Sequence, residues 1–135
     1  MPLHLTRVAF ACRSLADLAA AQDRFAHEGA DGTRVVRITS ARFPRRATEL
    51  AGGSLYWIIA HTIVARQAIL EVVPRADRAG AEIRLALPPI PTVPTPWRAH
   101  QGWRYLEASD APPDLDPADP LPPALRRELA TLGLW

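Results

Sequence analysis

The sequence predicts an α+β fold: a small, mainly antiparallel and partly closed β-barrel with flanking helices. Two observations support this prediction. Strand-like segments follow one another through the middle of the chain, and apolar residues recur at helical spacing near both ends. The chain has 135 residues, 48% of them hydrophobic, which is enough for one globular domain. We expect residues 1–110 to form this domain, and residues 111–135 to form a proline-rich acidic linker and a C-terminal helix that packs on it.

The N-terminal part predicts a strand followed by a helix. Residues 3–11 have strand composition, and Ser14 with Asp17 three positions later has the spacing of a capping box. Apolar residues then recur at helical spacing, with Phe25 as the heaviest apolar anchor. Gly29 is expected to end this helix.

A second strand and a short helix are predicted next. Residues 33–40 form the strand, and Pro44 opens the helix because proline is favoured at the first helical position. Gly52-Gly53 is expected to end the helix.

The apolar stretch "GGSLYWIIAHTIVARQAIL" (52–70) is too long for one strand. It predicts strands over residues 54–60 and 63–73, joined by a tight turn near His61-Thr62. Both faces of these strands carry apolar residues, so we expect a hairpin in the centre of the sheet.

Arg66 and Gln67 place polar side chains in the middle of this hairpin. Burying either one without partners is costly, so Glu49, Tyr56 or a ligand should supply them. We therefore interpret the hairpin as mostly core, with Arg66 or Gln67 reaching a site at one edge.

The C-terminal half combines one clear strand with two proline-rich segments. Residues 81–88 alternate apolar and polar side chains, which is typical of a strand. Residues 88–96 contain five prolines and are predicted to form an ordered loop or a polyproline segment. After the strand-like "GWRYLEA" and a second proline-rich linker, "ALRRELATLGLW" predicts a short amphipathic helix.

The charges of the chain are unevenly distributed. All sixteen basic residues are arginines, and the absence of lysine excludes Schiff-base chemistry and a Walker-type phosphate lysine. Residues 34–104 hold eleven arginines and four acids, whereas residues 105–135 hold two arginines and six acids. A basic middle followed by an acidic tail indicates a surface that faces anions.

Two arginine-rich clusters suggest binding. The first, "RVVRITSARFPRR" (34–46), spaces five arginines around Phe43, and Arg45 and Arg46 fall in the first turn of the predicted helix, where the dipole disfavours cations. Guanidinium groups bind phosphate through paired hydrogen bonds, and an aromatic ring offers a surface for stacking. The alternative is a solubilising surface.

The second cluster, "WRAHQGWRYL" (97–106), combines three aromatic residues with two arginines around Gly102. Trp103 and Tyr105 alternate with Arg104 along a strand, so the rings and the guanidinium should point to opposite sides. The alternative is that Trp103 and Tyr105 belong to the core and Trp97 covers it.

Several classes of protein lack support in the sequence. The single cysteine, Cys12, excludes an internal disulfide, and the histidines are scattered without a metal-binding motif. No nucleophile elbow, zinc-protease motif or phosphate-binding loop is present. No signal peptide or membrane-spanning run is evident. We expect a cytoplasmic protein that uses no metal, no cofactor and no catalytic residue, and that does not bind a membrane.

Long stretches of the chain resemble an uncharacterised bacterial family with a domain of unknown function. They are "RFPRRATELAGGSLYWIIAHTIVARQAIL" and "QGWRYLEASDAPPDL", which match the succession P-(K/R)-R-x-x-E-L, G-G-S-L-Y-W-(V/I)-I, R-Q-x-I-L and Q-G-W-R-Y-L. Ala60-His61 stands where that family has a Lys-Gly pair. The resemblance implies no activity.

The layout is also similar, more loosely, to the PUA-like barrels of the ASCH and EVE groups, which bind RNA or modified nucleotides. This likeness implies that Arg45, Arg46 and Glu49 face Trp57, Arg66, Trp103 and Arg104 across a cleft.

Three functions agree with these observations. The first is a non-enzymatic domain that binds RNA or a modified nucleotide, with arginines on phosphate and Trp97, Trp103 or Tyr56 stacked on a base. The second is a protein-interaction module, or a subunit of a larger complex, that uses residues 88–96 and the C-terminal helix. The third is a small nucleotide-processing hydrolase with Glu49 and Arg66. The candidate binding residues are Arg42, Arg45, Arg46, Glu49, Tyr56, Trp57, Arg66, Gln67, Trp97, Arg98, Trp103 and Arg104.

Overall fold

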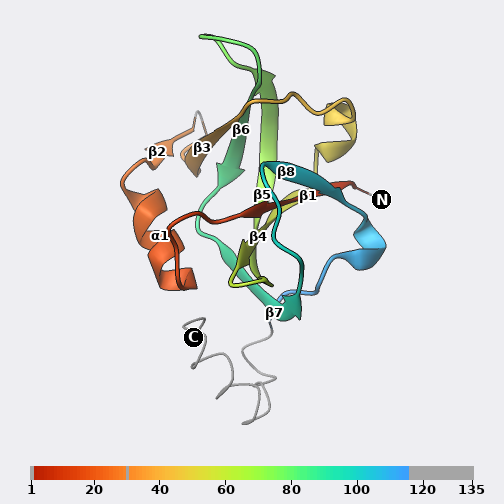
Figure 1. Ribbon diagram of the computed structural model, residues 1–135. Helices are drawn as coiled ribbons and strands as arrows, with labels where there is room; N and C mark the ends of the chain where they lie inside the picture. The colour runs from red at the N-terminus through yellow and green to blue at the C-terminus, as the bar shows by residue number, and fades with distance from the viewer. Residues whose placement is uncertain (1, 30, 116–135) are drawn as a thin grey trace, which may run out of the picture.

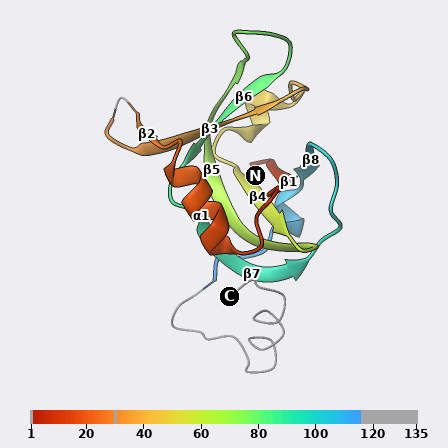
Figure 2. The ribbon, with the colours of Figure 1, turned by 60° about the vertical axis from the view of Figure 1, so that its left-hand side comes forward.

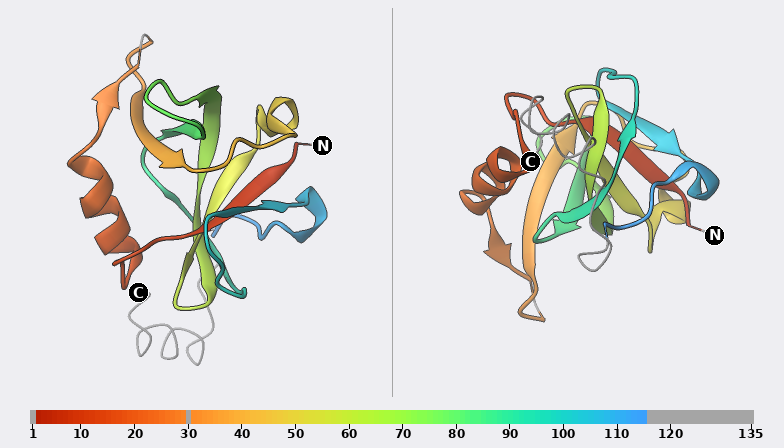
Figure 3. Two further views of the ribbon diagram at one scale, coloured as in Figure 1. Left: turned by 45° about the horizontal axis from the view of Figure 1, so that its top comes forward. Right: turned by 90° about the horizontal axis from the view of Figure 1, so that it is seen from below.

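The computed structural model describes residues 2–29 and 31–115, and this part of the chain is mostly β-structure (Figure 1). Its elements, in chain order, are β1 (His4–Val8), α1 (Leu15–Asp23), β2 (His27–Glu28), β3 (Arg34–Ser40), the 3-10 helix η1 (Ala47–Leu50), β4 (Ser54–Ile59), β5 (Thr62–Pro74), β6 (Ala81–Ala86), β7 (Ile90–Pro96), β8 (Trp103–Leu106) and the 3-10 helix η2 (Ala108–Asp110). In Figures 1 and 3, α1 and η2 lie on opposite sides of the molecule, and Figure 2 shows β2 and β8 on opposite sides of the sheet.

All eight strands belong to one sheet, in the order β2-β3-β6-β5-β4-β1-β8, with β7 paired to β5. Every pair is antiparallel except β1 with β4. The 13-residue β5 pairs with β4 and β7 through its first half and with β6 through its second half. The predicted mainly antiparallel sheet is confirmed. The sheet is not closed, because its two end strands are not paired with each other. These are the two-residue β2 and the four-residue β8.

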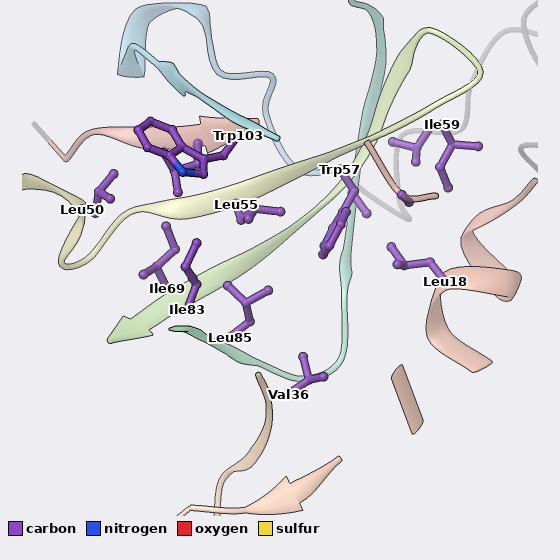
Figure 4. Close-up of a cluster of buried hydrophobic side chains, with 14 of the residues drawn as sticks. Leu18, Val36, Leu50, Leu55, Trp57, Ile59, Ile69, Ile83, Leu85 and Trp103 are labelled. Carbon is purple, nitrogen blue, oxygen red and sulfur yellow. The ribbon is translucent and has the colours of Figure 1, made fainter. Parts of the chain in front are cut away.

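The predicted central hairpin is confirmed as β4 and β5. All six residues of β4 are buried, because the strand has a packed cluster on each face. Leu55, Trp57 and Ile59 join the larger cluster, while Tyr56 and Ile58 join the smaller one. Figure 4 shows Trp57 near Leu18 of α1, with Trp103 at the other end of the larger cluster.

The turn of this hairpin consists of Ala60 and His61, between the paired residues Ile59 and Thr62. Both turn residues have positive φ angles, 50° and 57°. Two-residue hairpin turns of this kind favour asparagine and glycine, because an ordinary side chain is strained in the left-handed region.

Replacing Ala60-His61 by Asn-Gly is therefore expected to raise the free energy of unfolding by about 1 kcal/mol, in the range typical of corrected turn residues. The main-chain carbonyl of His61, which accepts a hydrogen bond from the Trp97 amide at 2.9 Å, is retained in the variant. Urea denaturation followed by circular dichroism measures the change. The β-branched Ala60→Val variant should be less stable than the wild type, and an Asn-Gly variant without a gain would contradict this account.

The first helix begins as predicted and ends earlier. The Ser14 side chain accepts a hydrogen bond from the Asp17 amide at 3.2 Å, which caps α1. The helix ends at Asp23 rather than at Gly29, because His27 and Glu28 leave it to pair with β3 as β2. The prediction that Phe25 anchors the helix in the core is wrong, since this residue is 72% exposed.

The short helix predicted from Pro44 begins later. Residues 45–46 form a turn, and η1 covers only Ala47–Leu50. Arg45 and Arg46 therefore precede the helix, and the argument from its dipole does not apply to them.

The prediction of a loop or polyproline segment over residues 88–96 is wrong, because residues 90–96 form β7. Prolines are tolerated in a strand that needs few of its own amide hydrogens for the ladder. On the side away from β5, Val93 donates to the Pro113 carbonyl and Leu115 donates to the Pro91 carbonyl, each at 2.9 Å. The first residues of the predicted linker thus lie along β7. The rest of the linker and the predicted C-terminal helix lie outside the described residues.

Candidate nucleic-acid interface

The two arginine-rich clusters of the sequence meet in the structure. The loop 41–46, between β3 and η1, lies against β8. Trp103 Nε1 donates to the Arg42 carbonyl at 3.0 Å, and Arg42 Nη2 donates to the Trp103 carbonyl at 3.2 Å. The Arg46 amide donates to Tyr105 Oη at 3.0 Å. Hydrogen bonds therefore hold the loop to the strand at both ends.

A depression of about 720 Å³ lies between this loop and β8. We call it the basic groove. Its lining residues are Arg42, Phe43, Arg45, Arg46, Trp103, Arg104 and Tyr105. Figures 1 and 3 show the backbone of the two segments that line it, the chain just before η1 and the strand β8.

In the groove, two guanidinium groups lie over the aromatic rings of β8. Trp103 is only 4% exposed, and the Arg42 guanidinium lies 4.2 Å from the centre of its ring. The Arg46 guanidinium lies 5.5 Å from the Tyr105 ring in the same manner. A guanidinium that lies over an aromatic ring on one side can still meet a second flat group on its other side. Phe43, at 39% exposure, adds an open ring to the lining.

Carboxylates neutralise only part of the positive charge. Arg46 forms two hydrogen bonds with Glu49, at 2.7 and 2.8 Å, and lies 3.6 Å from Glu107. The hydrogen bond from Arg46 lowers the pKa of Glu49, so this carboxylate stays ionised. Among the described residues, Arg42, Arg45 and Arg104 form no ion pair. These three arginines leave the groove with a net positive charge.

Comparison with known families gives one match, a model described as "Protein of unknown function (DUF1489)", over residues 5–135. The chain belongs to this family. The resemblance to an uncharacterised family is thereby confirmed. No curated protein and no solved structure matches the chain.

Arg66 of this DUF1489 domain lies outside the basic groove. Its guanidinium donates to both carboxylate oxygens of Asp114, at 2.6 and 2.8 Å, and to Ser54 Oγ at 3.0 Å. The predicted partners of Arg66 were Glu49, Tyr56 or a ligand; the structure shows Asp114 and Ser54 instead. Because Glu49 pairs with Arg46, the structure does not bring together the Glu49 and Arg66 pair of the hydrolase hypothesis.

Gln67 and Trp57 also lie outside the groove, and their polar atoms are bonded inside the protein. Gln67 is fully buried and exchanges two hydrogen bonds with Gln22 of α1, at 2.7 and 2.9 Å. Its Oε1 also accepts from Trp57 Nε1 at 2.7 Å, and its Nε2 donates to the Ala86 carbonyl at 3.1 Å. The predicted partners of Gln67 are therefore wrong: Gln22, Trp57 and the β6 main chain satisfy it.

The three remaining candidate residues, Tyr56, Trp97 and Arg98, also lie outside the basic groove. Tyr56 is buried with its ring edge-on to His4 at 5.2 Å, and Trp97 packs on the smaller cluster with it. Arg98 is exposed but lines none of the depressions described here. The structure thus brings together Arg42, Arg45, Arg46, Glu49, Trp103 and Arg104, and it separates Tyr56, Trp57, Arg66, Gln67, Trp97 and Arg98 from them.

Two lining residues of the groove, Phe43 and Tyr105, are additions to the candidate binding residues, and Glu107 is a further addition through its contact with Arg46. Tyr105 had a signal in the sequence, since it alternates with Arg104 and so shares a face with Trp103. Its ring lies 4.9 Å from that of Trp103, at an angle of 63°. Glu107 had no signal, because its contact with Arg46 depends on how the loop docks.

Within the described ranges, no group of three histidine, cysteine, aspartate or glutamate side chains has the arrangement of a metal site. None of the described helices is long and apolar enough to cross a membrane.

Proposed function

We propose that this DUF1489 domain is a non-enzymatic module that binds RNA or a nucleotide through the basic groove, on a PUA-like architecture. The observation that carries the proposal is the joining of two arginine- and aromatic-rich segments into one depression, although the hydrogen-bonded residues Arg42 and Trp103 are 61 positions apart in sequence. The open, mainly antiparallel sheet with a long central strand is compatible with such an architecture.

The chemistry of the groove suits a nucleotide on two counts. Arg45 and Arg104 are exposed and can form paired, charge-assisted hydrogen bonds with phosphate oxygens. Phe43 and the Arg42 guanidinium offer flat surfaces on which a base can stack. The expected stacking partners therefore differ from the sequence-based ones, because Trp103 and Tyr56 are buried.

Removing Arg45 and Arg104 together is expected to weaken binding of a fluorescent single-stranded RNA at least tenfold, without changing the melting temperature. If Arg42, Arg45 and Arg104 each contact a phosphate, the logarithm of the wild-type association constant should fall with the logarithm of salt concentration with a slope of about −2. The double variant should retain a slope of about −0.7. Fluorescence anisotropy at several salt concentrations measures both quantities.

Arg13→Ala with Arg24→Ala is the matched control. It removes the same amount of charge from two exposed arginines that do not line the groove and that form no ion pair with another described residue. This control should bind RNA almost as the wild type does. If both double variants weakened RNA binding equally, the effect would come from the net charge of the protein and not from the groove. A wild-type protein that binds no RNA or nucleotide at low salt would refute the proposal and favour a protein partner.

A further inference from the structure

A second depression continues the basic groove along the start of β8. It has a volume of about 350 Å³, and its lining residues are Ser40, Ala41, Arg42, Gln101, Gly102, Trp103 and Arg104. Three of these, Arg42, Trp103 and Arg104, also line the basic groove. The two depressions are therefore neighbours that meet at Arg42 and Arg104.

From this continuity we infer that the site is a track for a single strand of nucleic acid, which holds at least two successive nucleotides. This inference rests on the proposed function and makes it more specific. A mononucleotide would occupy only one of the depressions, whereas a strand crosses from the basic groove into the second depression.

The chemistry changes from one depression to the other. The basic groove offers guanidinium groups and Phe43, which suit a phosphate and a stacked base. The second depression adds Gln101, whose exposed side-chain amide forms no hydrogen bond among the described residues. A neutral amide both donates and accepts, so it can bind the edge of a base. Ser40 is less available, because its hydroxyl donates to the Arg42 carbonyl at 2.8 Å.

Gly102 lines the second depression without a side chain. It has a φ of 64°, and the space where a Cβ would stand has no neighbouring atom within 4 Å. A flat ring can therefore approach the main chain there.

The junction between the depressions suits the phosphate that links two nucleotides. Arg42 and Arg104 each line both depressions, and neither is paired with a carboxylate in the described part of the chain. A mononucleotide has no linking phosphate, so it cannot use the junction and both depressions together.

The test compares the lengths of bound RNA. Competition against a fluorescent RNA hexamer of mixed sequence is measured with 5′-phosphorylated mononucleotides, dinucleotides, trinucleotides and hexamers. The dinucleotides are expected to bind at least tenfold more tightly than the mononucleotides. Beyond three nucleotides the affinity should rise only a few-fold, because a longer RNA can occupy the site in more than one position.

Two substitutions locate the second nucleotide. Gln101→Glu places a negative charge in the second depression and should weaken dinucleotide binding at least tenfold while changing mononucleotide binding less than threefold. Gln101→Ala should weaken dinucleotide binding severalfold. Ser109→Ala, an exposed polar residue outside both depressions, is the control and should change neither.

The outcomes separate this inference from the proposed function. Mononucleotides that bind as tightly as dinucleotides, and that lose binding in the Arg45→Ala and Arg104→Ala variant, would overturn the track and leave the basic groove as a mononucleotide site. Dinucleotide binding that is unaffected by Gln101→Glu would also overturn the track. If no RNA of any length binds, both the proposed function and the track are refuted.

Discussion

Replacing Gln67 by leucine is expected to lower the free energy of unfolding by about 3–5 kcal/mol, since each buried polar group left without a partner costs about 1–3 kcal/mol. The substitution keeps the side chain's approximate size and removes its amide. Trp57 Nε1, the Gln22 amide and the Ala86 carbonyl then lose the partner that they share. Both Gln22 and Trp57 are buried, so water cannot easily replace the lost bonds.

The double variant Gln22→Leu with Gln67→Leu tests the origin of this loss. If the paired amides are the cause, removing both should cost less than the sum of the two single substitutions, because no glutamine is left with unpaired amide atoms. Urea denaturation followed by circular dichroism gives the three free energies. A Gln67→Leu variant within about 1 kcal/mol of the wild type would contradict the network, since ordinary surface substitutions fall within ±0.5 kcal/mol.

This network shows which features of the fold the sequence could predict. The β4–β5 hairpin follows from local composition, because β-branched and aromatic residues fill both strands on either side of a two-residue turn. The need of Gln67 for partners is also evident from its place in an apolar strand. The identity of the partner is not evident, because Gln22 lies 45 positions earlier and reaches Gln67 only once α1 has docked on the sheet.

The candidate site divides in the same way. Composition identifies the two arginine-rich clusters, and alternation along β8 correctly places Trp103 and Tyr105 on one face. Arg104, which alternation directs to the opposite side, nevertheless lines the groove with them. The junction of the two clusters depends on the hydrogen bonds between Arg42 and Trp103, which span 61 positions. The docking of the loop 41–46 on β8 decides whether the Trp103 ring is open to a ligand or covered by Arg42. Local sequence patterns do not encode this docking.

The incorrect elements have a common physical cause. Phe25 has helical spacing, yet the chain leaves the helix to add β2 to the edge of the sheet. The prolines of residues 90–96 argue against a central strand, yet β7 pairs with β5 alone within the sheet and so can accept them. In both cases the edge of the sheet permits what local propensity disfavours.

Gly53→Ala is expected to destabilise the domain by about 3 kcal/mol, at the upper end of the range for overpacking. Gly53 connects η1 to β4, and a Cβ atom at this position would overlap the carbonyl oxygen of Leu3. The second nearest atom, the carbonyl oxygen of Leu50, would lie 3.1 Å from it. Both obstacles are main-chain atoms, so no side-chain rotation can relieve the overlap.

The surrounding hydrogen bonds explain why the main chain cannot move aside without loss. The Gly53 amide donates to the Leu50 carbonyl, and its own carbonyl accepts from the Ile69 amide, each at 2.9 Å. Any shift that makes room for a methyl group therefore strains the end of η1 and the β4–β5 pairing together. Gly29→Ala is the matched control: its φ is not in the left-handed region, and its nearest neighbours would stand at an ordinary 3.4 Å. Thermal and urea denaturation should show a large loss for Gly53→Ala and a small change for Gly29→Ala. Equal effects of the two substitutions would show that the approach of the Leu3 carbonyl to Gly53 is not the constraint.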